Sequence, residues 1–134
     1  MHNYFLAKKP LFYKILSKLR QKFNYEKLLY LNEIKNGNIV LDIGANKGYY
    51  TSLFSTLVGK HGAVHSFEPV PETYKELQNL KTRFENVCKN NLAVGKESGT
   101  ATINYDPFDS EKATLIDTTL TLPKKSQTEV ISID

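Results

Sequence analysis

The chain has 134 residues, of which 40% are hydrophobic and 24% charged, and its formal net charge is +4. This is the composition of one ordinary globular domain, and no apolar run is long enough to span a bilayer. The single cysteine, Cys88, excludes an internal disulfide framework. Because a signal-peptide pattern is also absent, we expect a cytoplasmic protein.

We expect two parts, a basic N-terminal segment over 1–35 and a domain over 36–134. The segment carries eight lysines and arginines against two glutamates, and a helical pattern covers about 10–34 with a break near Asn24. Its apolar face consists of residues three and four apart: Phe12, Ile15, Leu16, Leu19 and Phe23. We favour a capping helix packed on the domain over one that contacts a membrane surface. Nucleic-acid binding is not indicated.

The domain begins with an apolar strand expected over Ile39–Ile43, which leads through a glycine turn into a helix from Gly48 to about Val58. We expect this strand to be buried. Asp42 lies within it, where an unpaired charge would be costly. Near the carboxyl end of the strand and beside Gly44, it is well placed for a nucleotide-type site, because glycine lets backbone and ligand approach closely.

The next strand, Ala63–Phe67, is followed by Glu68, 26 residues after Asp42. A carboxylate at this distance, one strand over, can accept hydrogen bonds from both hydroxyls of a ribose. A dinucleotide fingerprint would also need glycine where Asn46 and Tyr49 stand, so a nicotinamide dehydrogenase is a distant alternative. The observed spacing suits a ligand without phosphates, and S-adenosylmethionine has that shape.

The remaining pattern alternates helix and strand and then becomes mainly strand. We expect a helix over about Pro71–Phe84 and then a buried strand over Val87–Val94, which contains Cys88 as a core residue. A strand over Thr100–Asp106 should follow, with Ala101, Ile103 and Tyr105 on one face. After a polar loop over Pro107–Lys112, we expect two more strands, over Thr114–Leu122 and Glu129–Ile133. His61 is expected in a solvated turn and His65 within the second strand, on either its core or its surface side. Neither histidine has a partner at metal-ligand spacing, so no metal site and no general base are assigned.

Three blocks of this sequence resemble the FkbM family of S-adenosylmethionine-dependent methyltransferases. They are Leu41-Asp42-Ile43-Gly44-Ala45-Asn46-Lys47-Gly48-Tyr49-Tyr50-Thr51, Phe67-Glu68-Pro69-Val70-Pro71 and Asn91-Leu92-Ala93-Val94-Gly95. The resemblance extends from about Asn36 to Asp134. It implies an α/β, Rossmann-like class I methyltransferase fold and, usually, methylation of a hydroxyl on a sugar, glycan or secondary metabolite.

The resemblance also implies a role for each matching residue. Asp42 and Gly44 would line the methionine end of the cofactor, and Asn46 would fix the turn that Gly48 closes. Glu68 would hold the ribose hydroxyls. The residues implied near the adenine are Pro69, Val70 and Asn91.

A doubly wound sheet extends from its first strand in both directions, and this sequence supplies strands for one side only. We therefore expect a fold truncated after the first half of its sheet, which needs the missing C-terminal half as a partner. The acceptor would be a small molecule or glycan with a free hydroxyl. The alternative is a non-catalytic remnant or binding module that keeps the cofactor cradle.

Overall fold

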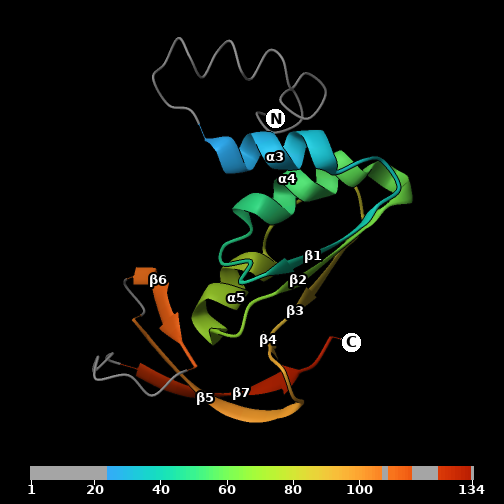
Figure 1. The fold of residues 1–134 in the computed structure, drawn as a ribbon. Helices are drawn as coiled ribbons and strands as arrows, with labels where there is room; N and C mark the ends of the chain where they lie inside the picture. Colours follow the sequence, from blue (N-terminus) through green and yellow to red (C-terminus); the bar gives the residue numbers. More distant parts are fainter. Residues whose placement is uncertain (1–23, 107–108, 116–123, 134) are drawn as a thin grey trace.

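The computed structural model describes residues 24–106, 109–115 and 124–133. Its first part is a three-stranded parallel sheet of order β1-β2-β3 (Figure 1), made of β1 (Ile39–Ile43), β2 (Ala63–Phe67) and β3 (Val87–Asn90). Helix α4 (Tyr49–Val58) connects β1 to β2, with a short 3₁₀ turn at Gly59–His61, and helix α5 (Pro71–Gln78) connects β2 to β3. Parallel strands joined by helices are the Rossmann-like α/β arrangement that the sequence predicted.

The main core lies between this sheet and the helices on one of its faces. Val64 of β2 and three residues of α4, Leu53, Phe54 and Val58, are buried in one cluster. Helix α3 (Tyr25–Glu33) forms the outer layer, where Tyr30 meets Phe54 edge to face with ring centroids 4.9 Å apart. A helix begins where the break was predicted, because the Asn24 side chain caps α3 by accepting from the Lys27 amide at 2.9 Å. The helical piece predicted before Asn24 lies outside the described residues. The apolar face predicted over 12–23 lies outside the described residues.

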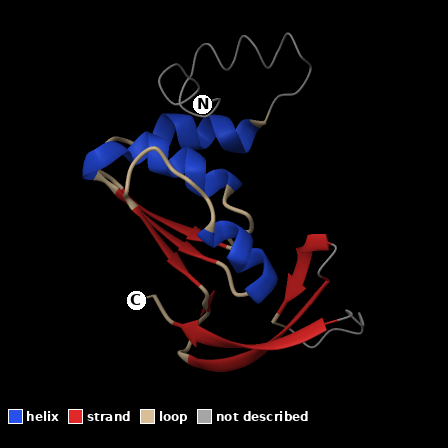
Figure 2. Ribbon diagram, turned by 180° about the vertical axis from the view of Figure 1, so that it is seen from behind, coloured by secondary structure: helices blue, strands red, loops and turns tan. Residues whose placement is uncertain are grey.

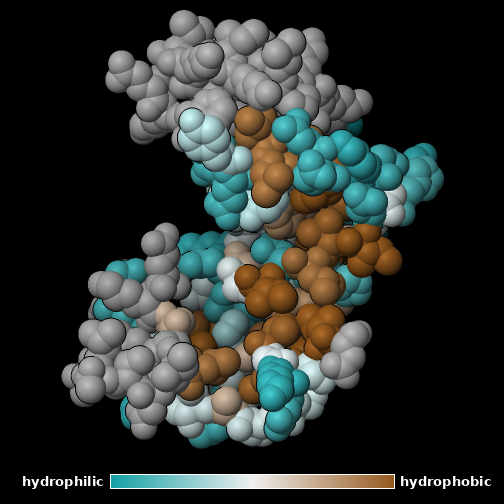
Figure 3. Space-filling model, in the orientation of Figure 1, coloured by the Kyte–Doolittle hydropathy of each residue, from teal (hydrophilic) through white to brown (hydrophobic). Residues whose placement is uncertain are grey.

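The opposite face of the sheet is not covered by any helix in the described part of the chain. Ile39, Leu41 and Ile43 point to this face and are 72%, 45% and 59% exposed, and Figure 3 shows apolar surface across this region. The prediction of a buried strand is therefore wrong for alternate residues of β1. Cys88 is exposed on β3, in register with His65, so the prediction that it is a core residue is also wrong.

A second sheet of four strands, in the order β4-β7-β5-β6, lies beyond the carboxyl ends of the first sheet (Figure 2). Its strands are β4 (Ala93–Val94), β5 (Gly99–Asp106), β6 (Asp109–Thr114) and β7 (Lys124–Ile131). β5 pairs antiparallel with both β6 and β7, whereas β4 runs parallel to β7. Ile103 and Tyr105 of β5 are buried against Val70, which joins this sheet to the loop after β2.

Several predicted boundaries differ from the structure. Helix α5 ends at Gln78 instead of Phe84, and the Lys89 ammonium satisfies the carbonyls of Gln78 and, beyond the helix, of Leu80. The predicted third strand divides into β3 and β4, which lie in different sheets. β6 occupies part of the predicted polar loop over 107–112, and the last strand begins at Lys124. Most of the strand predicted over 114–122 lies outside the described residues.

No helix in the described ranges is both long and apolar enough to cross a membrane.

Candidate cofactor-binding site

The turn after β1 is attached directly to the end of β2. The amides of Gly44 and Ala45 both donate to the Phe67 carbonyl, at 2.9 and 3.0 Å, and the Gly48 amide donates to the Ala45 carbonyl at 2.9 Å. Gly44 has a φ of 76° and Gly48 a φ of 86°, in the left-handed region that favours glycine. The turn therefore brings the backbone of 44–48 beside the first residues after β2.

Glu68 follows β2 and is the best-held carboxylate beside this turn. Its side chain is only 6% exposed. One oxygen, Oε2, accepts from the Asn46 amide at 2.8 Å, and the other, Oε1, accepts from the Val70 amide at 2.9 Å. Burial raises the pKa of Glu68 above 4.5, while these two amide hydrogen bonds oppose that rise. The carboxylate thus links the glycine turn to the loop after β2.

The two asparagines predicted near the cofactor support this arrangement. Asn46 has a φ of 51°, and its side-chain oxygen accepts from the Lys47 amide at 2.8 Å, which stabilises the turn as predicted. The Asn91 side chain donates to the Glu68 carbonyl at 2.8 Å, and the Asn90 carbonyl accepts from the Glu68 amide at 3.0 Å. Asn91 therefore braces the backbone of Glu68, and a contact with the adenine stays a prediction.

The two glycines of the turn have different surroundings. A Cβ atom built on Gly44 would have no neighbour within 4 Å. A Cβ atom on Gly48 would lie 2.6 Å from Leu80 Cδ2 and 2.8 Å from Leu77 Cδ1. Gly44 therefore borders open space that a ligand can occupy, whereas Gly48 permits close packing of the turn on the end of α5.

Asp42 lies on the helix-covered face of the sheet, under α4. The Thr51 hydroxyl donates to Asp42 Oδ2 at 2.5 Å, and the Ser66 hydroxyl donates to Thr51 Oγ1 at 3.1 Å. Asp42 is 8% exposed, and burial raises its pKa while the bond from Thr51 opposes that rise. The apolar strand accommodates this acid by hydrogen bonding, and contact with the methionine end of a cofactor stays a prediction.

Two of the three residues predicted near the adenine, Pro69 and Val70, have different surroundings. Pro69 is half-buried, whereas Val70 is only 3% exposed and packs against Ile103 and Tyr105. The Val70 side chain therefore belongs to the contact with the second sheet. Sequence reasoning did not anticipate this role, and it also missed Tyr105, whose hydroxyl donates to Glu72 at 2.7 Å. The only sequence signal for Tyr105 was its place on the apolar face of a strand.

The described residues contain no group of three or more histidine, cysteine or acidic side chains that could hold a metal ion. His61 is exposed, and His65 is half-buried on the open face of the sheet. Neither histidine has a described contact with the turn after β1.

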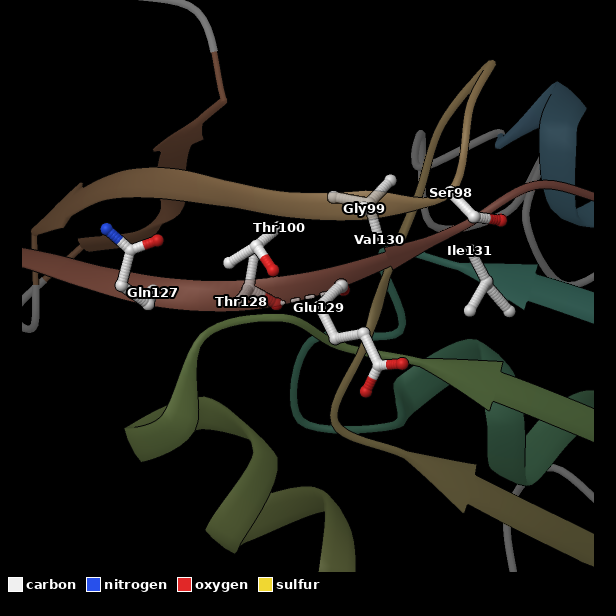
Figure 4. A pocket seen from close by; sticks show the side chains of 8 residues that line it. All are labelled: Ser98, Gly99, Thr100, Gln127, Thr128, Glu129, Val130 and Ile131. Carbon is white, nitrogen blue, oxygen red and sulfur yellow. Dashed lines mark hydrogen bonds between the residues drawn. The ribbon is translucent and has the colours of Figure 1, made fainter.

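A separate open depression lies on the second sheet (Figure 4). It is lined by Ser98 and by residues of β5 and β7, which are Gly99, Thr100, Gln127, Thr128, Glu129, Val130 and Ile131. None of the residues that border the glycine turn contributes to this depression. We therefore place the candidate cofactor site at Gly44 and Glu68 and not on the second sheet.

A parallel α/β sheet with a glycine turn after its first strand and a fixed carboxylate after its second defines a Rossmann-like nucleotide-type site. Comparison with known proteins identifies the family: residues 42–132 match the model of the methyltransferase FkbM domain. The chain therefore belongs to the FkbM family of S-adenosylmethionine-dependent methyltransferases.

Curated relatives are also methyltransferases. The chain is 34% identical over 94 residues to a protein-L-isoaspartate O-methyltransferase of Fervidobacterium nodosum. The matched region covers 69% of this chain and 45% of the relative. It is 31% identical over 78 residues to the protein-L-isoaspartate O-methyltransferase of Methanococcus maripaludis. Here the matched region covers 58% of this chain and 35% of the relative. The matched region thus spans less than half the length of these relatives. No solved structure matches the chain.

Proposed function

We propose that this chain is the S-adenosylmethionine-binding part of an FkbM-type O-methyltransferase whose acceptor is a hydroxyl of a sugar, glycan or secondary metabolite. The observation that carries the cofactor proposal is the buried Glu68 carboxylate, fixed by the amides of Asn46 and Val70 beside the open side of Gly44. When bound, the cofactor supplies a methyl group that is already activated on a sulfonium. The contribution of this chain is to bind and orient that cofactor.

The residues present fit this cofactor. Each oxygen of an ionised carboxylate can accept about two hydrogen bonds, so each Glu68 oxygen keeps capacity for one ribose hydroxyl beyond its amide partner. The open space at Gly44 would take the methionine tail, and Pro69 remains available beside the adenine. A ligand with a pyrophosphate would need glycine at Asn46 and Tyr49, which this turn lacks.

A second acceptor class is suggested by the relatives, because their names specify O-methylation of L-isoaspartate in proteins. An isoaspartyl acceptor offers a carboxylate, and its methylated product is an ester. A sugar or metabolite hydroxyl would instead give a methyl ether. We favour the hydroxyl acceptor because the family model that matches most of this chain is the FkbM domain.

Catalysis would also need polypeptide that covers the open face of the first sheet. Exposed Ile39, Leu41 and Ile43 form an apolar stripe on β1, and β1 is the edge strand of the described sheet. Such a stripe with a free strand edge favours pairing with further polypeptide. We propose that the rest of a methyltransferase domain, in cis or in trans, adds strands beside β1 and supplies the acceptor site and the general base. The alternative is a binding module that keeps the cofactor without turnover.

Two measurements test the proposal. Calorimetric titration of the folded chain with S-adenosylhomocysteine should show binding, and a folded chain that does not bind would contradict the cofactor assignment. With the complementary polypeptide present, label from S-adenosyl[methyl-³H]methionine should enter a product that survives alkali, as a methyl ether does. Release of labelled methanol in alkali would indicate an ester and favour the isoaspartate-type acceptor. Binding with no transfer to either acceptor class would favour the non-catalytic module.

A further inference from the structure

The loop between β2 and α5 connects the cofactor carboxylate to the second sheet. Glu68 Oε1 accepts from the Val70 amide at 2.9 Å, so the position of Val70 helps to set the direction of the carboxylate. The Val70 side chain is 3% exposed and packs against Ile103 and Tyr105, which are 2% and 4% exposed. The place of the Val70 amide therefore depends on strand β5.

A polar contact attaches the same strand to the first turn of α5, two residues beyond Val70. The Tyr105 hydroxyl donates to Glu72 Oε2 at 2.7 Å, and the Lys124 ammonium donates to Glu72 Oε1 at 2.8 Å. Tyr105 and Lys124 are register partners on β5 and β7, so neighbouring strands hold both oxygens of Glu72. Glu72 also lies in the first turn of α5, where a negative charge is favourable. The second sheet thus contacts the chain on both sides of Pro71, at Val70 in the loop and at Glu72 in α5.

The two contacts have different chemistry. The packing at Val70 is apolar and therefore non-directional. The hydrogen bond from Tyr105 to Glu72 is directional, because it requires a particular distance and angle between the hydroxyl and the carboxylate oxygen. Lys124 and Glu72 are about half exposed, with side-chain exposures of 48% and 41%, so their ion pair alone contributes little. Tyr105 is buried, so its hydrogen bond to Glu72 is better shielded from solvent than the ion pair.

We propose that Tyr105 and Glu72 are positioning residues that set the geometry of Glu68 and so determine how strongly the protein recognises the ribose hydroxyls of its cofactor. Tyr105 acts on Val70 directly, by packing, and also indirectly, because its hydrogen bond holds Glu72, which lies two residues beyond Val70 in the chain. Val70 in turn acts on Glu68 through its amide. This inference rests on the proposed cofactor site. It assigns the second sheet a part in cofactor recognition, although none of the residues of that sheet belongs to the glycine turn.

The test uses Tyr105→Phe, which removes the hydroxyl and keeps the packing against Val70. The matched control is Tyr74→Phe, because the Tyr74 hydroxyl also anchors α5 but donates at 3.1 Å to the Lys89 carbonyl on β3. Affinity is measured for S-adenosylhomocysteine and for its 2′-deoxy analogue. We expect Tyr105→Phe to reduce the preference for the ribose form about three- to tenfold, the effect of about one weakened hydrogen bond between Glu68 and the ribose, because Glu72 no longer holds the segment that carries the Val70 amide. Tyr74→Phe should leave that preference unchanged.

Amide hydrogen exchange gives a second result that needs no ligand. The Val70 amide should exchange faster in Tyr105→Phe than in Tyr74→Phe at equal global stability, because its bond to Glu68 is less well held. Unchanged exchange at Val70 together with an unchanged ribose preference in Tyr105→Phe would overturn the proposal. If the unmodified chain is folded and binds neither ligand, the cofactor assignment fails and the ribose role fails with it. Faster exchange at Val70 would then still show that Tyr105 positions Glu68.

Discussion

Alanine at Gly44 and alanine at Gly48 should damage different properties of the protein, although the two positions lie in one turn. Both have positive φ values, 76° and 86°, so alanine at either position is strained by about 1–2 kcal/mol. At Gly44 the new methyl group would meet no atom within 4 Å. Gly44→Ala should therefore cost only this strain in the free energy of unfolding, and it should weaken binding because the methyl group enters the space proposed for the methionine tail.

At Gly48 the new methyl group would lie 2.8 Å from Leu77 and 2.6 Å from Leu80. Leu80 is half-buried and can move aside, whereas Leu77 is fully buried. Overpacking of this kind costs about 1–3 kcal/mol, so strain and crowding together should lower the free energy of unfolding by about 2–5 kcal/mol. That is a large part of a typical domain stability of about 5–15 kcal/mol.

The assay compares urea unfolding, followed by circular dichroism, with calorimetric affinity for S-adenosylhomocysteine. Gly44→Ala should be the more stable variant and the weaker binder, and Gly48→Ala the less stable variant with nearly normal affinity per folded molecule. The two substitutions then separate a ligand contact from a packing contact. Equal stability of the two variants, or weaker binding by Gly48→Ala than by Gly44→Ala, would refute this reasoning.

Three further predictions follow from the buried acids and the open sheet face. Burial raises the pKa of Glu68 above its ordinary value, and ribose binding needs the ionised carboxylate. As the pH is lowered, the affinity for the cofactor should therefore begin to fall at a pH above the range in which an ordinary glutamate is protonated. Calorimetry should show that Glu68→Gln lacks this pH dependence. Asp42→Asn keeps an acceptor for the Thr51 hydroxyl and should leave the free energy of unfolding unchanged. Asp42→Leu removes the acceptor and should lower the free energy of unfolding, measured in urea, by about 1–3 kcal/mol. Equal losses for the two variants would argue against this account. Cys88 is exposed, so a thiol reagent should modify the folded protein nearly as fast as the unfolded one, and strong protection would show that its strand face is covered.

The first half of the fold could be predicted well because its signals are local. β1 and β2 begin and end where predicted, since each is an apolar run that a turn residue or a charged residue closes. Asn24 caps α3 and Gly48 precedes α4, which are further local signals. Residues close in sequence determine these features, so one sequence was enough.

The predictions that failed depend on contacts between distant residues. The residues around Cys88 predict a strand, and Cys88 does lie on β3. Its exposure, however, depends on whether another element covers its face of the sheet. Helix α5 ends earlier than predicted, and its last carbonyl, that of Gln78, accepts from Lys89, eleven residues further along the chain. Periodicity within the helix does not reveal a contact of this kind.

The candidate site shows the same limit. The sequence located Glu68 at the end of the second strand, and the structure places it beside the glycine turn as expected. The motif does not show which way each side chain faces, and the Val70 side chain packs against Tyr105. A contact between Val70 and the adenine stays a prediction. The bond from Tyr105 to Glu72 joins residues 33 positions apart, and no spacing rule predicts such a contact.

The most direct test of the central claim is the calorimetric affinity for S-adenosylhomocysteine of the unmodified chain, Glu68→Ala and Glu68→Gln. Glu76→Ala is the matched control, because Glu76 is an exposed glutamate whose ion pair with Lys47, at 3.1 Å, lies on the surface. The account predicts that Glu68→Ala weakens binding by about 1.5–3 kcal/mol, that Glu68→Gln loses less because it keeps one acceptor, and that Glu76→Ala binds normally. Equal affinity of the unmodified chain and Glu68→Ala, with both folded, would contradict the assignment of this carboxylate to the ribose.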